Sequence, residues 1–299
     1  NLFQQFYTMV DSVVVGRFVG ENALAAVGAS YSLTNVFISI AIGGGMGASV
    51  LTSRYFGGRN YKRMKTSVST ALLSFLAVSI VLGGAGLLLG KEIMELLNTP
   101  ENIMEDATEY LNIYFIGLPF LFMYNVLASM FNALGKSRIP LYLLIFSSVF
   151  NVVLDVIMVY SFHMGVAGVA WATLIAQGIS AVMAFLIFAG EMKSYEGGEQ
   201  SQWFDKRELG EMCRIALPSI LQQSTVSIGM MLVQSVVNSF GAQMLAGYSA
   251  GMRIESICIV PMTAMGNVMS SYTAQNLGAG KQERAVKGYH TAYGIVFGF

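Results

Sequence analysis

The chain has 299 residues and a formal net charge of zero, and its composition is unlike that of a soluble protein. Apolar residues make up 55% and charged residues only 11%, whereas soluble domains carry about 25% charged residues. We therefore expect the chain to lie in a lipid bilayer. The lack of net charge argues against a nucleic-acid partner. The two cysteines are too few for a disulfide scaffold or a Cys-rich metal site.

Apolar runs of the length that spans a bilayer, about 20 residues, follow one another along the chain. We predict helices at residues 1–19, 24–53, 66–90, 110–133, 139–161, 166–190, 213–238, 246–275 and 288–299. The chain begins and ends inside apolar runs, so we interpret it as a fragment of a longer protein. The predicted fold is an all-α polytopic membrane protein.

Basic residues gather in alternate connections between these helices. They occupy the connections around residues 54–65, 136–138, 193–214 and 281–287, which together hold 14 of the 17 Lys and Arg residues. The connections between them carry mostly acids, for example Glu101, Glu105 and Glu109. Short loops rich in Lys and Arg face the cytoplasm. We therefore expect a multi-pass protein of the cell membrane whose basic loops are cytoplasmic.

An internal repeat appears when the chain is shifted on itself by 221 residues. Residues 15–64 and 236–285 then match without gaps, with 11 of 50 positions identical. Because the offset spans six helices, an even number, both copies insert in the same direction, as in parallel-repeat transporters. We predict two six-helix bundles: an N-terminal bundle at 1–190, a cytoplasmic linker at 191–212, and a truncated second bundle at 213–299.

Three polar residues lie at one predicted depth within the membrane. Asp11, Asp155 and Thr173 each fall six or seven residues from the outer end of their helix, which places them about 9–10 Å below the outer surface. An ionisable residue at such a depth costs about 2.5–3.5 kcal/mol on insertion scales, so it is treated as a candidate for function. We expect Asp11 and Asp155 to meet in an interior pocket.

On each of these three helices, further polar residues share one face with Asp11, Asp155 or Thr173. The first set is Gln4, Thr8 and Asp11, the second is Ser148, Asn151 and Asp155, and the third is Thr173 and Gln177. Lipid disfavours such faces, so we expect them to line a cavity. For Thr8, Ser148 and Gln177, hydrogen bonding between helices is the simpler interpretation. Two desolvated carboxylates close together favour uptake of a proton or small cation, and these oxygen ligands suit H⁺ or Na⁺ rather than soft metals.

Several of these segments resemble the MATE (multidrug and toxic compound extrusion) transporters. Residues 4–17, QQFYTMVDSVVVGR, are similar to the family's first-helix signature. Residues 54–59 (RYFGGR) and 132–140 (NALGKSRIP) resemble its first two cytoplasmic loops, residues 151–155 (NVVLD) its fifth helix, and residues 275–280 (QNLGAG) the matching loop of its second half. The resemblance implies two six-helix bundles around a V-shaped cleft.

The resemblance also implies roles for particular residues. The family exports organic, often cationic, compounds in exchange for H⁺ or Na⁺, and its prokaryotic members carry the cation site in the N-terminal bundle. On that pattern the site consists of Asp11, Asn151, Asp155 and Thr173. Gln4, Asn125 and Gln177 are expected in the substrate cavity. Glu255, also expected in the substrate cavity, is a candidate substitute for an acidic residue that some members carry on the seventh helix, where this chain has Gln222 and Gln223; the alternative is that Arg253 nearby simply neutralises it.

We therefore expect a secondary multidrug efflux antiporter, not an enzyme, that acts as a monomer on small organic compounds. The coupling ion, H⁺ or Na⁺, stays open, and no other cofactor is expected. One alternative is a flippase for lipid-linked precursors of the same superfamily, which requires a basic cleft. A second alternative is a membrane-embedded enzyme, which requires a His, Cys or Lys constellation that the sequence does not present.

Overall fold

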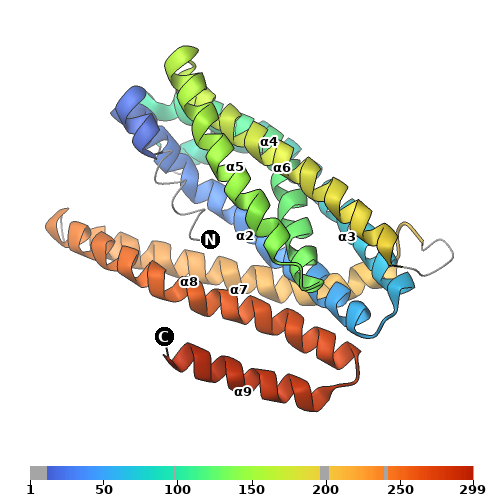
Figure 1. The fold of residues 1–299 in the computed structure, drawn as a ribbon. Helices are drawn as coiled ribbons and strands as arrows, with labels where there is room; N and C mark the ends of the chain where they lie inside the picture. The colour runs from blue at the N-terminus through green and yellow to red at the C-terminus, as the bar shows by residue number, and fades with distance from the viewer. Residues whose placement is uncertain (1–11, 97–98, 196–201, 239–241, 299) are drawn as a thin grey trace.

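A computed structural model describes residues 12–96, 99–195, 202–238 and 242–298, and helices dominate all four segments. Residues 12–18 are helical and lead into a series of longer helices (Figure 1). These are α2 (Glu21–Gly57), α3 (Tyr61–Leu96), α4 (Glu101–Ala133), α5 (Arg138–Val156), a π-helical turn η1 (Ile157–Ser161), α6 (Gly165–Ser194), α7 (Lys206–Asn238), α8 (Ala242–Gly278) and α9 (Gln282–Gly298). The predicted all-α fold is confirmed.

Most helices extend beyond the apolar runs that predicted them. α4 begins at Glu101 rather than at residue 110, and α7 begins at Lys206 rather than at residue 213. Polar residues continue a helix into water without difficulty, so the apolar run marks the membrane-buried part and not the helix ends. The predicted linker, 191–212, therefore overlaps the end of α6 and the start of α7. Just before α7, the backbone N–H of Asp205 donates to Thr70 Oγ1 of α3 at 3.0 Å.

Five helical stretches in the described residues are long and apolar enough to cross a membrane. They are Leu33–Gly57, Tyr61–Glu95, Glu101–Ala133, Arg138–Ser161 and Gly165–Ser194. All five belong to the predicted N-terminal bundle. Their lengths, from 24 to 35 residues, exceed the roughly 20 that a bilayer requires.

The internal repeat is visible in the connections that follow α2 and α8. Arg59 and Gly280, which the 221-residue offset relates, both have a positive φ, 54° and 71°. The backbone N–H of Asn60 donates to Tyr55 at 2.9 Å, and at the equivalent positions Lys281 donates to Asn276 at 2.8 Å. Both helices thus end in the same left-handed turn with the same bond spanning six residues. The repeat predicted from sequence is confirmed in this region.

The glycines at the middle of α2 let three other helices approach it. A Cβ on Gly43 would lie 2.9 Å from the backbone of Ile220 in α7, and one on Gly47 would lie 2.6 Å from the carbonyl oxygen of Met212 in the same helix. A Cβ on Gly44 would meet the ring of Phe75 in α3 at 2.6 Å, and one on Gly45 would meet Ser129 in α4 at 2.7 Å. Small residues allow this close helix packing in membranes.

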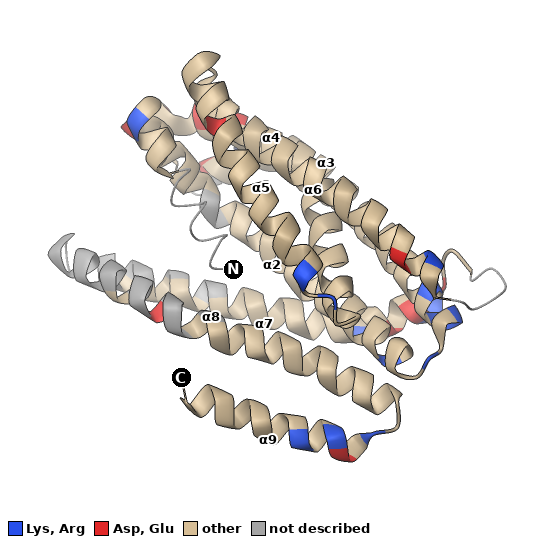
Figure 2. Ribbon diagram, viewed as in Figure 1, with Lys and Arg blue, Asp and Glu red and all other residues tan. Residues whose placement is uncertain are grey.

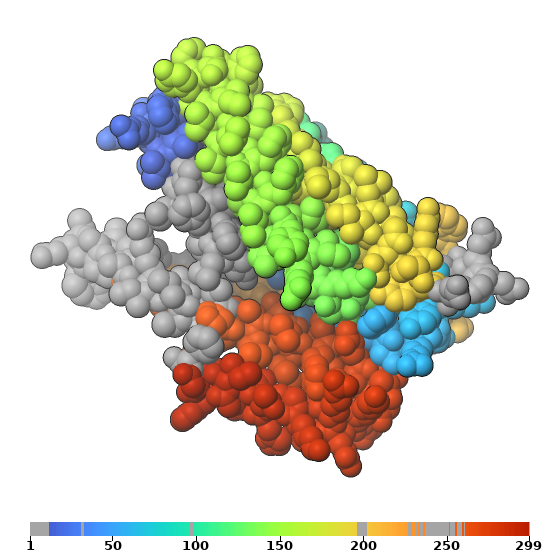
Figure 3. Space-filling model, in the orientation of Figure 1, coloured from blue at the N-terminus to red at the C-terminus, as the bar shows by residue number. Residues whose placement is uncertain are grey.

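Figures 1 and 3 show α2–α6 as one block and α8–α9 as another, with the two blocks closest where α2 meets α3 and α8 meets α9. Figure 2 shows Lys and Arg concentrated at this end, together with some acidic residues, and a second group of acidic residues at the opposite end of α3 and α4. We call the former the basic end. It comprises the Lys and Arg residues in and beside the connections α2–α3, α4–α5, α6–α7 and α8–α9: Arg54, Arg59, Lys62, Arg63, Lys65, Lys136, Arg138, Lys193, Lys206, Arg207, Lys281, Arg284 and Lys287.

Candidate functional site

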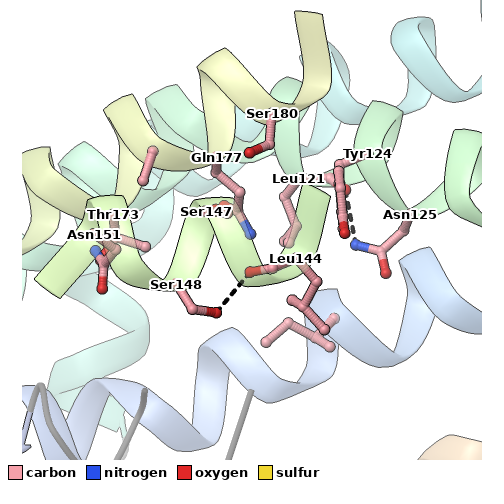
Figure 4. A pocket seen from close by; sticks show the side chains of 12 residues that line it. Leu121, Tyr124, Asn125, Leu144, Ser147, Ser148, Asn151, Thr173, Gln177 and Ser180 are labelled. Atoms are coloured by element: carbon pink, nitrogen blue, oxygen red, sulfur yellow. Dashed lines mark hydrogen bonds between the residues drawn. The ribbon is translucent and has the colours of Figure 1, made fainter. Parts of the chain in front are cut away.

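A polar cavity of about 60 Å³ lies inside the block of α2–α6 (Figure 4). On this measure of volume, about 10–15 Å³ holds one water molecule, so the cavity can accept several waters or a partly hydrated small cation. α4, α5 and α6 supply most of its wall, with one residue from α2. The lining residues are Ile38, Leu121, Tyr124, Asn125, Leu144, Ser147, Ser148, Asn151, Thr173, Ala176, Gln177 and Ser180.

The predicted cation ligands Asn151 and Thr173 meet in the wall of this cavity. The Asn151 side-chain amide donates to Thr173 Oγ1 at 3.2 Å, which joins α5 to α6. Asn151 is 3% exposed. The bond requires that the two helices present their polar faces to each other, as the spacing of these residues along each helix predicted.

Asp155 lies one helical turn beyond Asn151, toward the end of α5 that is remote from the basic end. Its side chain is fully buried. Directly after it, the helix loosens into the π-helical turn η1. Such turns inside helices are frequent at functional sites, because the extra residue per turn displaces backbone and side-chain groups from regular packing. A buried ionisable residue within a membrane helix is treated as a candidate functional residue.

The predicted site is only partly within the described residues. Asp11 and Gln4 lie outside them, so the predicted meeting of Asp11 with Asp155 stays a prediction. Glu255 is exposed on α8 and is not among the residues that line the cavity. Asn125 and Gln177, predicted to line a substrate cavity, do line this one. The cation-binding and substrate-binding roles of all these residues also stay predictions.

The cavity has polar residues that the sequence interpretation did not include. Ser180 is 1% exposed and its hydroxyl has no hydrogen-bond partner among the described residues. It continues the face formed by Thr173 and Gln177, so the same spacing would have found it. Tyr124 also lines the cavity and donates from its hydroxyl to Pro140 O at 3.2 Å. Ser180 lies two turns beyond Thr173 on α6, toward the basic end.

A second, smaller cavity of about 10 Å³ adjoins the first. Both have Leu121, Thr173 and Gln177 in their walls. From there the second cavity extends along α4 to Tyr110, toward the end opposite the basic end. Thr173 and Gln177 therefore lie between the larger cavity and the smaller one, which is nearer the end opposite the basic end. In the described residues, no group of three or more His, Cys, Asp or Glu side chains could hold a metal ion.

Comparison with known proteins shows which family the chain belongs to. The sequence model of the MatE family matches residues 1–157 and 218–299. The chain belongs to the MatE family. The family and its named relatives are transporters, which sets aside the membrane-embedded enzyme.

Relatives and solved structures of MatE proteins match nearly all of the chain. The probable multidrug resistance proteins YpnP and YoeA of Bacillus subtilis (strain 168) are 31% and 29% identical to it, each over 95% of the chain. The chain spans 63% of the length of each. A solved structure described as the outward-facing conformation of a multidrug resistance MATE family transporter of the MOP superfamily superposes with a TM-score of 0.91 at 24% identity. That match covers 99% of this chain and 66% of the other, and it supports the fold.

Proposed function

We propose that the full-length protein is a secondary active efflux antiporter of the cell membrane, which exports small organic, often cationic, compounds in exchange for H⁺ or Na⁺. The observation that carries the proposal is the buried Asp155 one turn from the bonded pair Asn151 and Thr173. Placing a carboxylate in a membrane helix costs free energy, so a protein that keeps one is expected to use it. The names of the relatives, multidrug resistance proteins, support the substrate class.

The basic end faces the cytoplasm in this proposal, following the general preference of Lys and Arg. Asp155 then lies toward the external side, one turn from Asn151, which lines the larger cavity; Asp155 itself is fully buried and lines neither cavity. Binding of the ion neutralises the carboxylate and changes the packing of α5 against α6 and the first helix. The ion is released inward when the two bundles change their relative tilt.

The chemistry of the cavity favours the antiporter over a flippase for anionic lipid-linked precursors. Its lining residues, as far as the structure describes them, are hydroxyl, amide, aromatic and aliphatic, and none is basic. An anionic headgroup would find hydrogen-bond donors there but no positive charge. An organic cation, in contrast, is attracted to carbonyl and hydroxyl oxygens and to aromatic faces such as that of Tyr124.

The test is ethidium efflux from proteoliposomes that contain the full-length protein, with pH and Na⁺ gradients imposed separately. We expect one gradient to drive efflux and Asp155→Asn to abolish the driven component. Glu105→Gln, which changes an exposed acid at the end of α4 remote from the basic end, is the matched control and should transport normally. Normal driven efflux by Asp155→Asn would refute the assignment, and efflux that ignores both gradients would refute ion coupling.

A further inference from the structure

The connection between α6 and α7 is bonded to the start of α3 at the basic end (Figure 1). Just after α6, the backbone oxygen of Tyr195 accepts a hydrogen bond from Lys65 Nζ at 2.7 Å. Just before α7, the Asp205 N–H donates to Thr70 Oγ1. The connection joins the two predicted bundles, so its two ends are held on fewer than two turns of one helix of the first bundle.

The face of α3 that meets this connection changes from charged to apolar along the helix. Lys62, Ser69, Leu73 and Ile80 have the spacing of residues that share one face. Lys62 is exposed, and so are the side chains of Leu73 and Ile80. Ser69 Oγ lies 3.5 Å from the backbone oxygen of Gln202. The connection therefore crosses α3 one turn, about 6 Å along the axis, before the exposed apolar part begins.

The apolar part of α3 faces lipid rather than protein. Among the five apolar stretches that the structure describes, it is the least buried, with 17% of its most apolar part covered. The crossing at Ser69 consequently lies where the acyl chains of a bilayer give way to the headgroups. This level is fixed by the sequence of α3, since Lys62 requires water or headgroups and Leu73 requires acyl chains.

Two adjacent aromatic residues are exposed at this level. Trp203 is 77% exposed and Phe204 is 43% exposed. Their neighbours on either side, Gln202 and Asp205, are the residues that contact α3, so the backbone of the pair is held while both rings stay accessible. Tryptophan is enriched at the boundary between water and acyl chains, because its ring is apolar and its N–H donates a hydrogen bond.

Positive charge lies directly beside the aromatic pair. Lys206 and Arg207 are both exposed at the start of α7 and add to the exposed cation on α3. The nearest described acids already have partners: Asp205 Oδ1 accepts the backbone N–H of Arg207 at 2.8 Å, and the buried Glu208 accepts the Tyr55 hydroxyl at 2.9 Å. Lys and Arg at such a surface attract the phosphate groups of anionic lipids.

We propose that the connection between α6 and α7 is a membrane anchor: Trp203 and Phe204 insert at the boundary of the leaflet at the basic end, and Lys206 and Arg207 bind phosphate groups of anionic lipids there. The exposed apolar face of α3 beside the crossing favours lipid over another segment of protein as the partner. The anchor ties the first bundle and the start of the second to the same membrane surface. It requires neither an ion gradient nor an exported compound, so it stands apart from the proposed transport function.

The first test measures the depth of Trp203 in a bilayer. Trp171, the other tryptophan of the sequence, and any tryptophan in the remainder of the full-length protein are replaced by Phe. The protein is reconstituted with lipids that are brominated either near the headgroup or near the end of the acyl chain. We expect the shallow bromines to quench Trp203 fluorescence more than the deep bromines or aqueous iodide do. Any other order, or no quenching by all three, would overturn the anchor.

The second test measures the preference for anionic lipid in the same protein. Shallow-brominated phosphatidylglycerol and phosphatidylcholine compete with their unbrominated forms, and the quenching gives their relative affinities at Trp203. Lys206→Gln and Arg207→Gln should each lower the relative affinity for phosphatidylglycerol about fivefold. Lys91→Gln, which removes an exposed cation at the opposite end of α3, is the matched control and should change nothing. Unchanged affinity in both test variants would overturn their role, whereas this quenching pattern without driven efflux would overturn only the transport function.

Discussion

The polar cavity of α4–α6 and the glycine seam of α2, formed by Gly43, Gly47 and Gly57, show opposite ways of packing membrane helices. Around Asn151, helices leave a cavity of about 60 Å³ and fill its wall with hydroxyl and amide groups. Along Gly43, Gly47 and Gly57, helices approach until a single added carbon would overlap a neighbouring backbone. α2 contributes to both regions, since its Ile38 also lines the cavity.

This difference in packing indicates that the two regions have different roles. A loosely packed polar space costs packing energy, and it persists where it holds water, an ion or a substrate. Glycines, in contrast, let two helices approach until their backbones are in contact. We therefore expect binding in the cavity and close helix contact along the glycines of α2. Substitutions in the two regions should consequently change different properties of the protein.

The largest effect on stability is expected in the seam. Gly47→Leu inserts a side chain where a Cβ would already lie 2.6 Å from Met212 O, so it should destabilise the protein by about 1–3 kcal/mol through overpacking. Thermal unfolding of the purified full-length protein measures the change. Gly190→Leu, at a position with no neighbour within 4 Å, is the matched control and should unfold at nearly the wild-type temperature. Similar unfolding temperatures for the two variants would show that the seam is not tightly packed.

A smaller, functional effect is expected in the cavity. Thr173→Val keeps the shape of the side chain but removes the oxygen that accepts the Asn151 amide at 3.2 Å. Loss of such a bond costs about 0.5–1.5 kcal/mol, so we expect cation affinity to fall by about two- to tenfold. The measurement is the ion concentration that gives half-maximal efflux. Thr173→Ser keeps the hydroxyl and should retain the affinity; equal losses in both variants would indicate a packing role instead.

The smallest effect concerns the pH dependence of the contact between α2 and α7. Burial raises the pKa of Glu208 above its ordinary value of 4.5, more than its hydrogen bond with Tyr55 lowers it. Glu211 and Asp205 raise this pKa further, and Arg63 lowers it. A raised pKa means that folding favours the protonated acid, so this stabilisation is complete below pH 4.5 and is lost as pH rises through the folded-state pKa.

Glu208→Gln mimics the protonated acid and can still accept the Tyr55 hydrogen bond. Its unfolding temperature relative to wild type should therefore increase as pH rises from below 4.5 to neutral. Glu283→Gln, an exposed acid at the start of α9, should show no such trend. A difference between Glu208→Gln and wild type that is constant with pH would contradict the assignment of a raised pKa.

The fold was predictable because apolar length determines which segments enter the membrane. The helix ends were not, since polar turns such as Glu101–Glu109 continue a helix outside it. The repeat was predictable because Gly57 and Gly278 match at a constant offset, yet the close approach of each to the backbone of the other copy was not. Sequence similarity between two copies does not say where the copies touch.

The site was predictable where spacing along a helix determines which residues share a face. Asn151 and Thr173 were identified in this way, and the structure joins them. Ser180 continues the face of Thr173 and Gln177, but serine is common in membrane helices as packing glue and does not by itself indicate a cavity. The π-helical turn after Asp155 was not predictable because no residue pattern in Ile157–Ser161 distinguishes it from a regular helix. These features depend on tertiary packing, which neighbouring helices decide.

Direct cation binding tests the central claim most closely. Tracer Na⁺ binding and proton uptake after a pH jump are measured on the purified full-length protein, without a membrane or an exported compound. The account predicts saturable binding of one of the two cations, retained in Glu105→Gln and lost in Asp155→Asn. Binding by Asp155→Asn equal to that of the wild-type protein would contradict it.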